Sequence, residues 1–302
     1  MSKYTEQNER PVPCVDVIVL NDNDEILLAR RNVEPQKGKW GIIGGRMKVS
    51  DFNAEAACQR ETCLDVEVVD LVGVLGDPEI NPPADTRFYA VQVIYTARII
   101  FGNLQNSQEA DSFRWVGLGD ASKENLAFDH NLILRTYHER KVAGKLIPVF
   151  QRTVFDKFKE KEYVYLNSDI IKFTAKAIVL NDKKEILLCK RGIMPFYGAW
   201  DFPGGHLLMG ESVEQCMLRE MREELGVGGK AGELFHVYSD RGGGPKCMDV
   251  VAFYFAEIDS YHFQKNIEMQ DFHFFPLDQL PAEIAYHNEG VLKDIRAMIL
   301  GK

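Results

Sequence analysis

The chain contains the same unit twice, and this repeat constrains its architecture more than any other feature. Residues 15–31 read VDVIVLNDNDEILLARR, and residues 175–191 read AKAIVLNDKKEILLCKR. Over the paired stretches 15–45 and 175–205 there are 15 identities in 31 positions. Self-similarity of this extent indicates a tandem duplication. The 302 residues also suit two domains of about 150 residues each.

The duplication extends over nearly the whole of both halves. The offset between equivalent residues is 160 at first and later 158, where Ala127-Phe128 faces Ala285-Tyr286. Between the halves lies a charge run, Lys157-Phe-Lys-Glu-Lys-Glu162, which is typical of a linker and lead-in strand. We therefore predict one domain over residues 1–145 and a second over residues 146–302.

Each unit has the pattern of an α/β layered domain. In the second unit, Ser212 is followed by Gln215 at the spacing of a capping box, and Gly226 suits the end of the same helix. An Asn181-Asp182 turn between two apolar runs indicates a hairpin. The predicted elements are strands at 177–180, 185–188, 233–238 and 249–257, and helices at 212–225 and 288–300.

Three glutamates on the first of these helices carry the chemical argument. Glu220, Glu223 and Glu224 are spaced i, i+3, i+4, so they share one helix face, where like charges repel. A hard cation such as Mg²⁺ or Mn²⁺, which prefers oxygen ligands, resolves this conflict. A solvated acidic face paired with Arg219 and Arg222 is the alternative. The flexible Pro203-Gly-Gly205 loop just before the helix favours the metal site, because backbone groups there can approach a metal or a phosphate.

The residues around these glutamates match a known signature without a gap. The segment resembles the MutT/Nudix hydrolases, whose pattern is G-x5-E-x7-R-E-U-x-E-E-x-G-U. The matching residues are Gly205, Glu211, Arg219-Glu220, Met221, Glu223-Glu224, Gly226 and Val227. The resemblance implies two tandem α/β/α sandwich domains, each with a mixed β-sheet. It also implies hydrolysis of a nucleoside diphosphate linked to another moiety, by attack of water at phosphorus.

The resemblance further implies a role for each residue. Glu220, Glu223 and Glu224 would ligate Mg²⁺ or Mn²⁺, and the Gly205 carbonyl would be an extra ligand. Glu211 would support the cluster and Arg219 would orient it. The general base would be Glu220 or Glu268, which precedes a predicted strand. Glu268 is equally well explained as a solvated loop carboxylate, so both interpretations stay open.

The first half has lost most of this signature between Gly45 and Val68. In one alignment Arg60-Glu61 matches Arg219-Glu220, Asp51 stands for Glu211, and Leu64-Asp65 replaces the glutamate pair. In another, one helical turn is deleted and Arg60-Glu61-Thr62-Cys63 is the end of the helix. Two or three carboxylates remain in either case, and dispersed acids rarely hold Mg²⁺. We therefore predict a first domain with weak or no catalytic activity.

Two roles for the first domain are open. Residues 76–95 and the string Leu126-Ala-Phe-Asp-His-Asn131 resemble ADP-ribose pyrophosphatases and their non-hydrolysing sensor relatives, although His130 also suits a helix start. Gly44-Gly45-Arg46 is similar to GDP-mannose hydrolases. Alternatively, the domain is a retained dimer partner, because many Nudix domains work as homodimers. The chain would then be an internal pseudo-dimer, with further oligomerisation left open.

Composition limits the partners. The net charge of −9 argues against non-specific binding to nucleic acid. No apolar run approaches the roughly 18 residues of a membrane span, and Met1 to Pro13 is polar, which predicts a cytoplasmic protein. The six cysteines form no CxxC pair, which argues against structural zinc. The favoured function is a pyrophosphohydrolase of ADP-ribose, a dinucleotide or a nucleotide sugar. The alternative is a nucleotide sensor or scaffold with a vestigial active site.

Overall fold

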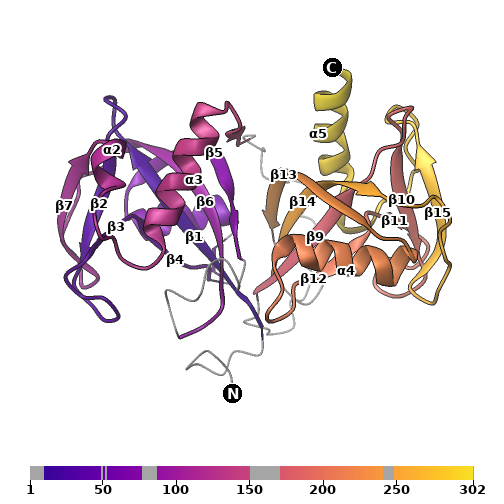
Figure 1. Cartoon of the computed structure of the whole chain (residues 1–302), viewed down its shortest axis with the longest axis horizontal. Helices are drawn as coiled ribbons and strands as arrows, with labels where there is room; N and C mark the ends of the chain where they lie inside the picture. Colours follow the sequence, from indigo (N-terminus) through magenta and orange to yellow (C-terminus); the bar gives the residue numbers. More distant parts are fainter. Residues whose placement is uncertain are drawn as a thin grey trace. The chain divides into compact units, whose positions relative to one another are not determined.

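The chain folds into two compact units, residues 1–164 and 165–302. The computed structural model describes residues 10–48, 50–51, 53–76, 87–149, 171–240 and 248–301. Figure 1 shows both units as β-sheets with packed helices. The boundary between the units, including the predicted linker run at 157–162, lies outside the described residues. Each unit is considered by itself.

The first unit is built on a mixed sheet in the order β3-β2-β1-β6-β5-β8, with β4 also paired to β1 and β7 to β2. The central pair, β1 and β6, is parallel, and β1 pairs antiparallel with β4. The elements are β1 (Val12–Leu20), β2 (Ile26–Arg31), β3 (Trp40–Gly41), β4 (Ile43–Arg46), α1 (Ala54–Thr62), β5 (Asp65–Leu75), β6 (Ala90–Phe101), β7 (Ala110–Val116), α2 (Leu118–Ala121), α3 (His130–Val142) and β8 (Ile147–Pro148). Because β8 pairs with β5, residues 147–148 pack with the first unit, just beyond the boundary expected at 145.

The second unit repeats this plan with two sheets, β12-β9-β14-β13 and β11-β10-β15. Its central pair, β9 and β14, is again parallel. The predicted mixed α/β architecture, duplicated in tandem, is therefore confirmed. The elements are β9 (Ile171–Ile178), β10 (Ile186–Arg191), β11 (Trp200–Asp201), β12 (Gly204–His206), α4 (Val213–Leu225), β13 (Gly229–Asp240), β14 (Met248–Ile258), β15 (Met269–Phe275), the short 3-10 helix η2 (Ala285–His287) and α5 (Glu289–Leu300).

The predicted hairpin at Asn181-Asp182 is present only at its tip. Leu180 and Ile186 form an antiparallel bridge, but β9 and β10 then separate into different sheets. They diverge because β9 pairs with β14 whereas β10 pairs with β15. Each strand therefore leaves the turn toward a separate long-range partner, which a local sequence pattern does not reveal.

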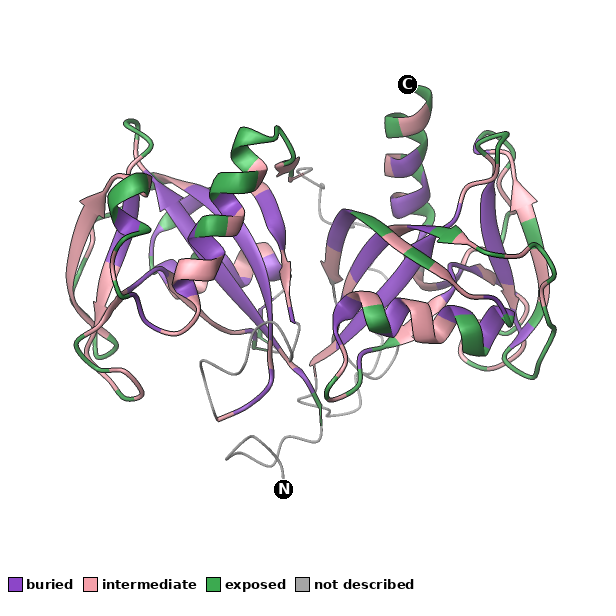
Figure 2. Ribbon diagram, viewed as in Figure 1, coloured by how far each residue is buried: buried purple, intermediate pink, exposed green. Residues whose placement is uncertain are grey.

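In each unit the core lies between the sheet and the last helix. In the first unit, Ile18 and Leu20 of β1 pack in one cluster with Ile133 and Tyr137 of α3. In the second unit, residues of β9, β10 and β14 form the equivalent cluster with α5. Figure 2 shows buried residues running along the central strands, with exposed residues on the outer faces of the helices. Among the described helices, none is both long and apolar enough to cross a membrane.

Candidate active site

Helix α4 begins and ends where its sequence predicts. The Ser212 side chain accepts a hydrogen bond from the Gln215 backbone, and the Gln215 side chain accepts one from the Ser212 backbone. This capping box satisfies two of the N–H groups that a helix start leaves unpaired. At the other end Gly226 has φ +72°, a left-handed conformation that glycine adopts readily. The caps fix the register in which the helix presents its glutamates.

Arg219 is the organising residue of the site. Its guanidinium donates to both carboxylate oxygens of Glu211, at 2.9 and 2.8 Å. It also donates to Glu220 at 2.7 Å and to Glu223 at 3.0 Å. A further bond at 3.0 Å reaches the carbonyl of His206, the last residue of β12 before the helix. The planar, five-donor geometry of arginine allows this set of contacts, which ties the loop to the carboxylate face.

Glu224 is held by the backbone of the glycine loop. The Gly204 N–H donates to Oε2 of Glu224 at 2.8 Å, and the side chain is buried. Gly204 has φ +143°, and a Cβ there would overlap the backbone of β9. A Cβ on Gly205 would instead overlap the carboxylate of Glu220. Gly204 therefore permits the close approach of β12 to β9, and Gly205 permits the close approach of β12 to Glu220.

The electrostatics favour a bound cation. Burial raises the pKa of Glu220, and the charges of Glu223 and Glu211 add to the effect, while Arg219 opposes it. Burial also raises the pKa of Glu224 well above its usual range, against the Gly204 hydrogen bond. At Glu211 burial acts in the same direction but is outweighed by Arg219 and by the Leu208 N–H, so its pKa is lowered. Burial thus makes the charged forms of two predicted ligands, Glu220 and Glu224, costly, and a bound cation would offset that cost.

The donor set fits Mg²⁺ or Mn²⁺ in kind. Glu220, Glu223 and Glu224 are hard oxygen ligands, and Gly205 lies against Glu220, since a Cβ there would overlap its carboxylate. Within the described residues no group of three acidic, histidine or cysteine side chains already converges as a bound metal requires. The three glutamates do not converge because Arg219 binds Glu220 and Glu223, whereas the Gly204 N–H binds Glu224.

Glu268 lies on a loop attached to the C-terminal end of α4. The Asn266 side chain donates to the carbonyls of Glu223 and Glu224, at 3.1 and 3.0 Å. Asn266 also accepts from the Glu268 N–H at 2.9 Å. The Glu268 side chain is exposed, and its carbonyl accepts a bond from Gly192. The predicted base is thus anchored near the helix by its backbone, and its role stays a prediction.

A buried charged cluster beside the site was not predicted from the sequence. Asp201 accepts hydrogen bonds from Lys176, from Asn288 at 2.8 Å and from Arg191 at 3.3 Å. All four residues are buried, and the charges of Lys176 and Asp201 act on Glu224. The sequence held one signal for this cluster. At the 160-residue offset, Lys176 faces Asp16 and Asp201 faces Gly41, two chemical changes within an otherwise similar stretch.

The first unit keeps the arginine framework of the same site. Arg60 donates to both oxygens of Asp51, at 2.6 and 2.8 Å, and to the carboxylate of Glu61. It also donates to the Arg46 carbonyl at 3.0 Å, as Arg219 does to His206. Gly45 lies against Glu61, because a Cβ there would be 2.6 Å from its Oε1. These contacts support the alignment of Arg60-Glu61 with Arg219-Glu220.

The glutamate pair of the first unit has been deleted rather than replaced. Helix α1 ends at Thr62, with Cys63 in the left-handed conformation that Gly226 has in α4. The strand register shows how many residues are missing. Val74 of β5 pairs with Val93 of β6, and in the second unit Val237 of β13 pairs with Ala252 of β14. Equivalent residues therefore differ by 163 in number between β5 and β13, but by only 159 between β6 and β14. The equivalents of Glu223 and Glu224 are therefore not Leu64 and Asp65, because one turn of helix is missing after Glu61.

Comparison with known proteins agrees with this architecture. A family model described as the NUDIX domain matches residues 10–137 and again residues 172–295. An ADP-ribose pyrophosphatase of Methanocaldococcus jannaschii is 30% identical over 160 residues, which make up 51% of this chain and 92% of that protein. The ADPR responsive transcriptional repressor NtrR of Acinetobacter baylyi is 32% identical over 134 residues, or 41% of this chain, and the match spans 52% of the repressor.

Among solved structures, a MutT NUDIX hydrolase from Burkholderia pseudomallei is 27% identical, with a TM-score of 0.38; the match covers 41% of this chain and 98% of that one. Both units thus match the same domain family, and the second retains the complete arginine and glutamate arrangement described above. The chain belongs to the Nudix hydrolase family and carries two of its domains in tandem.

Proposed function

We propose that the second domain is a divalent-metal-dependent pyrophosphohydrolase. Its substrate would be a nucleoside diphosphate linked to another moiety, of the ADP-ribose, dinucleotide or nucleotide-sugar class. One observation carries the proposal: Arg219 joins Glu211, Glu220 and Glu223 in one hydrogen-bonded group, on the helix face that also presents Glu224. The similarity to an ADP-ribose pyrophosphatase over most of that protein's length supports the substrate class.

Some residues of the site would bind the cation, and others would orient the residues that bind it. Glu220, Glu223, Glu224 and the Gly205 carbonyl would hold Mg²⁺ or Mn²⁺. When bound, such a metal polarises phosphoryl oxygens and makes its water more acidic. Arg219 orients Glu220, and the Gly204 N–H orients Glu224, so both carboxylates are fixed before substrate arrives. Glu211 anchors Arg219 and does not face the substrate in this scheme.

Proton transfer from the attacking water needs a base, and two residues are candidates. Glu220 is partly buried beside Arg219, whereas Glu268 is exposed on the loop that Asn266 attaches to α4. Glu220 is also a proposed metal ligand, so its substitution would change metal affinity together with turnover. Substitution of Glu268 with glutamine would change turnover alone if Glu268 is the base. Equal rates in Glu268→Gln and the native chain would leave the role to Glu220.

The proposal is tested by product release from a panel of ADP-ribose, NADH, diadenosine polyphosphates, nucleotide sugars and nucleoside triphosphates, with Mg²⁺ and with Mn²⁺. Glu224→Gln should abolish turnover of the best substrate while the protein stays folded. Glu214→Gln is the matched control, because Glu214 lies on the same helix but outside the signature positions. Folded protein that binds metal yet turns over no member of the panel would favour the nucleotide sensor instead.

A further inference from the structure

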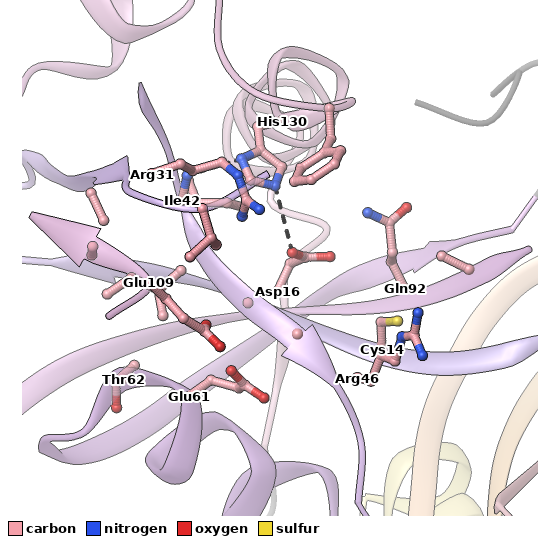
Figure 3. Close-up of a pocket in the computed structure, with 18 of the residues that line it drawn as sticks. Cys14, Asp16, Arg31, Ile42, Arg46, Glu61, Thr62, Gln92, Glu109 and His130 are labelled. Atoms are coloured by element: carbon pink, nitrogen blue, oxygen red, sulfur yellow. Dashed lines mark hydrogen bonds and ion pairs between the residues drawn. The ribbon is translucent and has the colours of Figure 1, made fainter. Parts of the chain in front are cut away.

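The first domain contains a pocket of about 880 Å³. Residues of β1, β2, β4, β6, α1 and the start of α3 line it, together with the loop at 105–109. Figure 3 shows Asp16 at its centre, with His130 above it, Glu61 below it, and Gln92 and Arg46 to one side. The volume is within the range of small-molecule sites, which is roughly 300–1,000 Å³.

The floor of the pocket is a carboxylate whose hydrogen bonds are incomplete. Asp16 is 5% exposed, and within the described residues its Oδ2 has no hydrogen-bond partner. Asp16 lies on the same face of β1 as Ile18 and Leu20, which belong to the core. Gly44 permits this position, because a Cβ there would overlap Oδ1 of Asp16. A buried acceptor of this kind is rare in a folded protein and indicates a missing partner.

None of the described neighbours of Asp16 makes a hydrogen bond to its Oδ2, although Gln92 lies close enough to lower the pKa of Asp16. His130 accepts a bond at 3.1 Å from the Ile42 N–H through Nδ1, so its neutral ring carries the proton on Nε2. Nε2 is 3.8 Å from Oδ1 of Asp16, which is too long for a hydrogen bond (dashed line in Figure 3). Gln92 donates to Asp129 at 3.1 Å. Carboxylates of Asp16, Asp129 and Glu61 thus line one pocket, which favours a ligand that brings hydrogen-bond donors.

Planar groups line the same pocket. The Arg46 guanidinium stacks over the Phe88 ring at 3.8 Å, and that of Arg31 lies 4.7 Å from the centre of the Phe128 ring. Stacked arginine and aromatic planes suit a planar heterocycle, and guanidinium groups also bind phosphate. The pocket therefore combines an acceptor for an amino group with surfaces for a ring and an anion.

In the second domain, the residues equivalent to Asp16 and His130 find their hydrogen-bond partner within the domain. Lys176, the counterpart of Asp16, pairs with Asp201, and Asn288, the counterpart of His130, donates to the same carboxylate. The first domain has Gly41 in place of Asp201, so this internal partner is gone and the charge at the β1 position is reversed. The first domain is therefore chemically distinct here and is more than a degraded copy.

The first domain lacks the glutamate pair that would hold a divalent metal. Helix α1 has lost the turn that would carry the glutamate pair, and Glu61 is already bound by Arg60. We propose that the first domain binds, without a metal and without hydrolysing it, a nucleotide whose base carries an exocyclic amino group, and that this group donates a hydrogen bond to Asp16. This binding is independent of the hydrolysis proposed for the second domain.

The test is calorimetric titration of the full chain in excess EDTA, which suppresses metal-dependent turnover. The probes form two matched pairs: AMP with purine riboside 5′-monophosphate, and GMP with inosine 5′-monophosphate. Only the first member of each pair has the exocyclic amino group. At least one amino nucleotide should bind with one equivalent per chain and about fivefold more tightly than its counterpart, the difference expected for one hydrogen bond of about 1 kcal/mol.

Asp16→Leu should remove this preference, and Asp16→Val is the second variant if the leucine protein does not fold, because asparagine would keep an oxygen that accepts from the amino group. Hydrogen exchange should show ligand-induced protection in β1 and at the start of α3, which locates the ligand in the first domain. Absence of binding in EDTA, binding without preference for the amino group, or a preference retained in both variants would each overturn the proposal.

Discussion

Replacing Asp16 with asparagine should change how the stability of the first domain depends on pH. Burial raises the pKa of Asp16 to about 8, with further contributions from the charges of Asp129 and Glu61, and Gln92 opposes the shift. In the unfolded chain the same group has its ordinary pKa of 3.8. Between these values the folded domain retains a proton that the unfolded chain has released. Stability must therefore fall as the pH rises through this window.

The size of the effect follows from proton linkage. One proton held only by the folded state changes the free energy of unfolding by about 1.4 kcal/mol per pH unit. Asparagine does not titrate, so Asp16→Asn removes this slope and leaves all other titrations in place. From about pH 5 to pH 7 the variant should gain about 2.7 kcal/mol relative to the native chain. The comparison of slopes does not depend on the cost of burying the amide itself.

The assay is urea unfolding followed by tryptophan fluorescence at several pH values. The chain has three tryptophans, and Trp200 is the one in the second domain. A Trp200→Phe background therefore leaves Trp40 and Trp115, which report on the first domain. Asp111→Asn is the control, because the partly exposed Asp111 accepts a bond from Arg30 that lowers its pKa. Asp111 is then ionised in both the folded and the unfolded state over this pH range, so the control should leave the pH dependence of stability unchanged.

A constant difference between Asp16→Asn and the native chain over the whole range would refute the reasoning. It would mean that the Asp16 carboxylate ionises in the folded domain near its ordinary pKa. A donor that is not evident from its neighbours would then have to stabilise the charge.

Three further predictions concern the second domain. Arg219→Lys should weaken Mg²⁺ binding by roughly 10- to 100-fold, because lysine cannot hold Glu211 through two bonds and reach Glu220 as well. Titration calorimetry with Mg²⁺ would measure the change, and an unchanged affinity would contradict the organising role of Arg219. Gly205→Ala should displace Glu220 and lower turnover, with little change in helix content. Steady-state kinetics would measure turnover and circular dichroism the helix content. Full activity would show that the close approach of Gly205 to Glu220 is dispensable. Ser212→Ala removes the N-terminal cap of α4 and should reduce the free energy of unfolding of this domain by about 1 kcal/mol. Urea unfolding would measure the difference, and a change below the error of the measurement would argue against the capping box.

The sequence predicts helix α4 almost to the residue, for local reasons. The capping box and Gly226 determine where the helix begins and ends, and the i, i+3, i+4 spacing determines which face carries the glutamates. The contact between Gly204 and Glu224 was not predicted, although the glycine-rich loop indicated that backbone groups could approach the site. Such a contact depends on tertiary packing of the loop, which no periodicity encodes.

The first domain shows where sequence reasoning stops. Both alignments of the degenerate segment placed few carboxylates in it, yet each described only part of the change. The contacts of Arg60 support its alignment with Arg219, as in the first alignment, and the register of β5 against β6 supports the deleted turn of the second. The environment of Asp16 was also beyond prediction, because its unpaired oxygen depends on side chains from β6, α1 and α3 that meet only in the folded domain.

The missing turn of α1 also limits what mutation can do to this protein. A substituted ligand can return by a single base change, but four absent residues can return only by an insertion in frame. No point mutation in the first domain can therefore recreate the pair that Glu223 and Glu224 form in the second. By point mutation alone, the division between an intact and an altered domain is therefore irreversible.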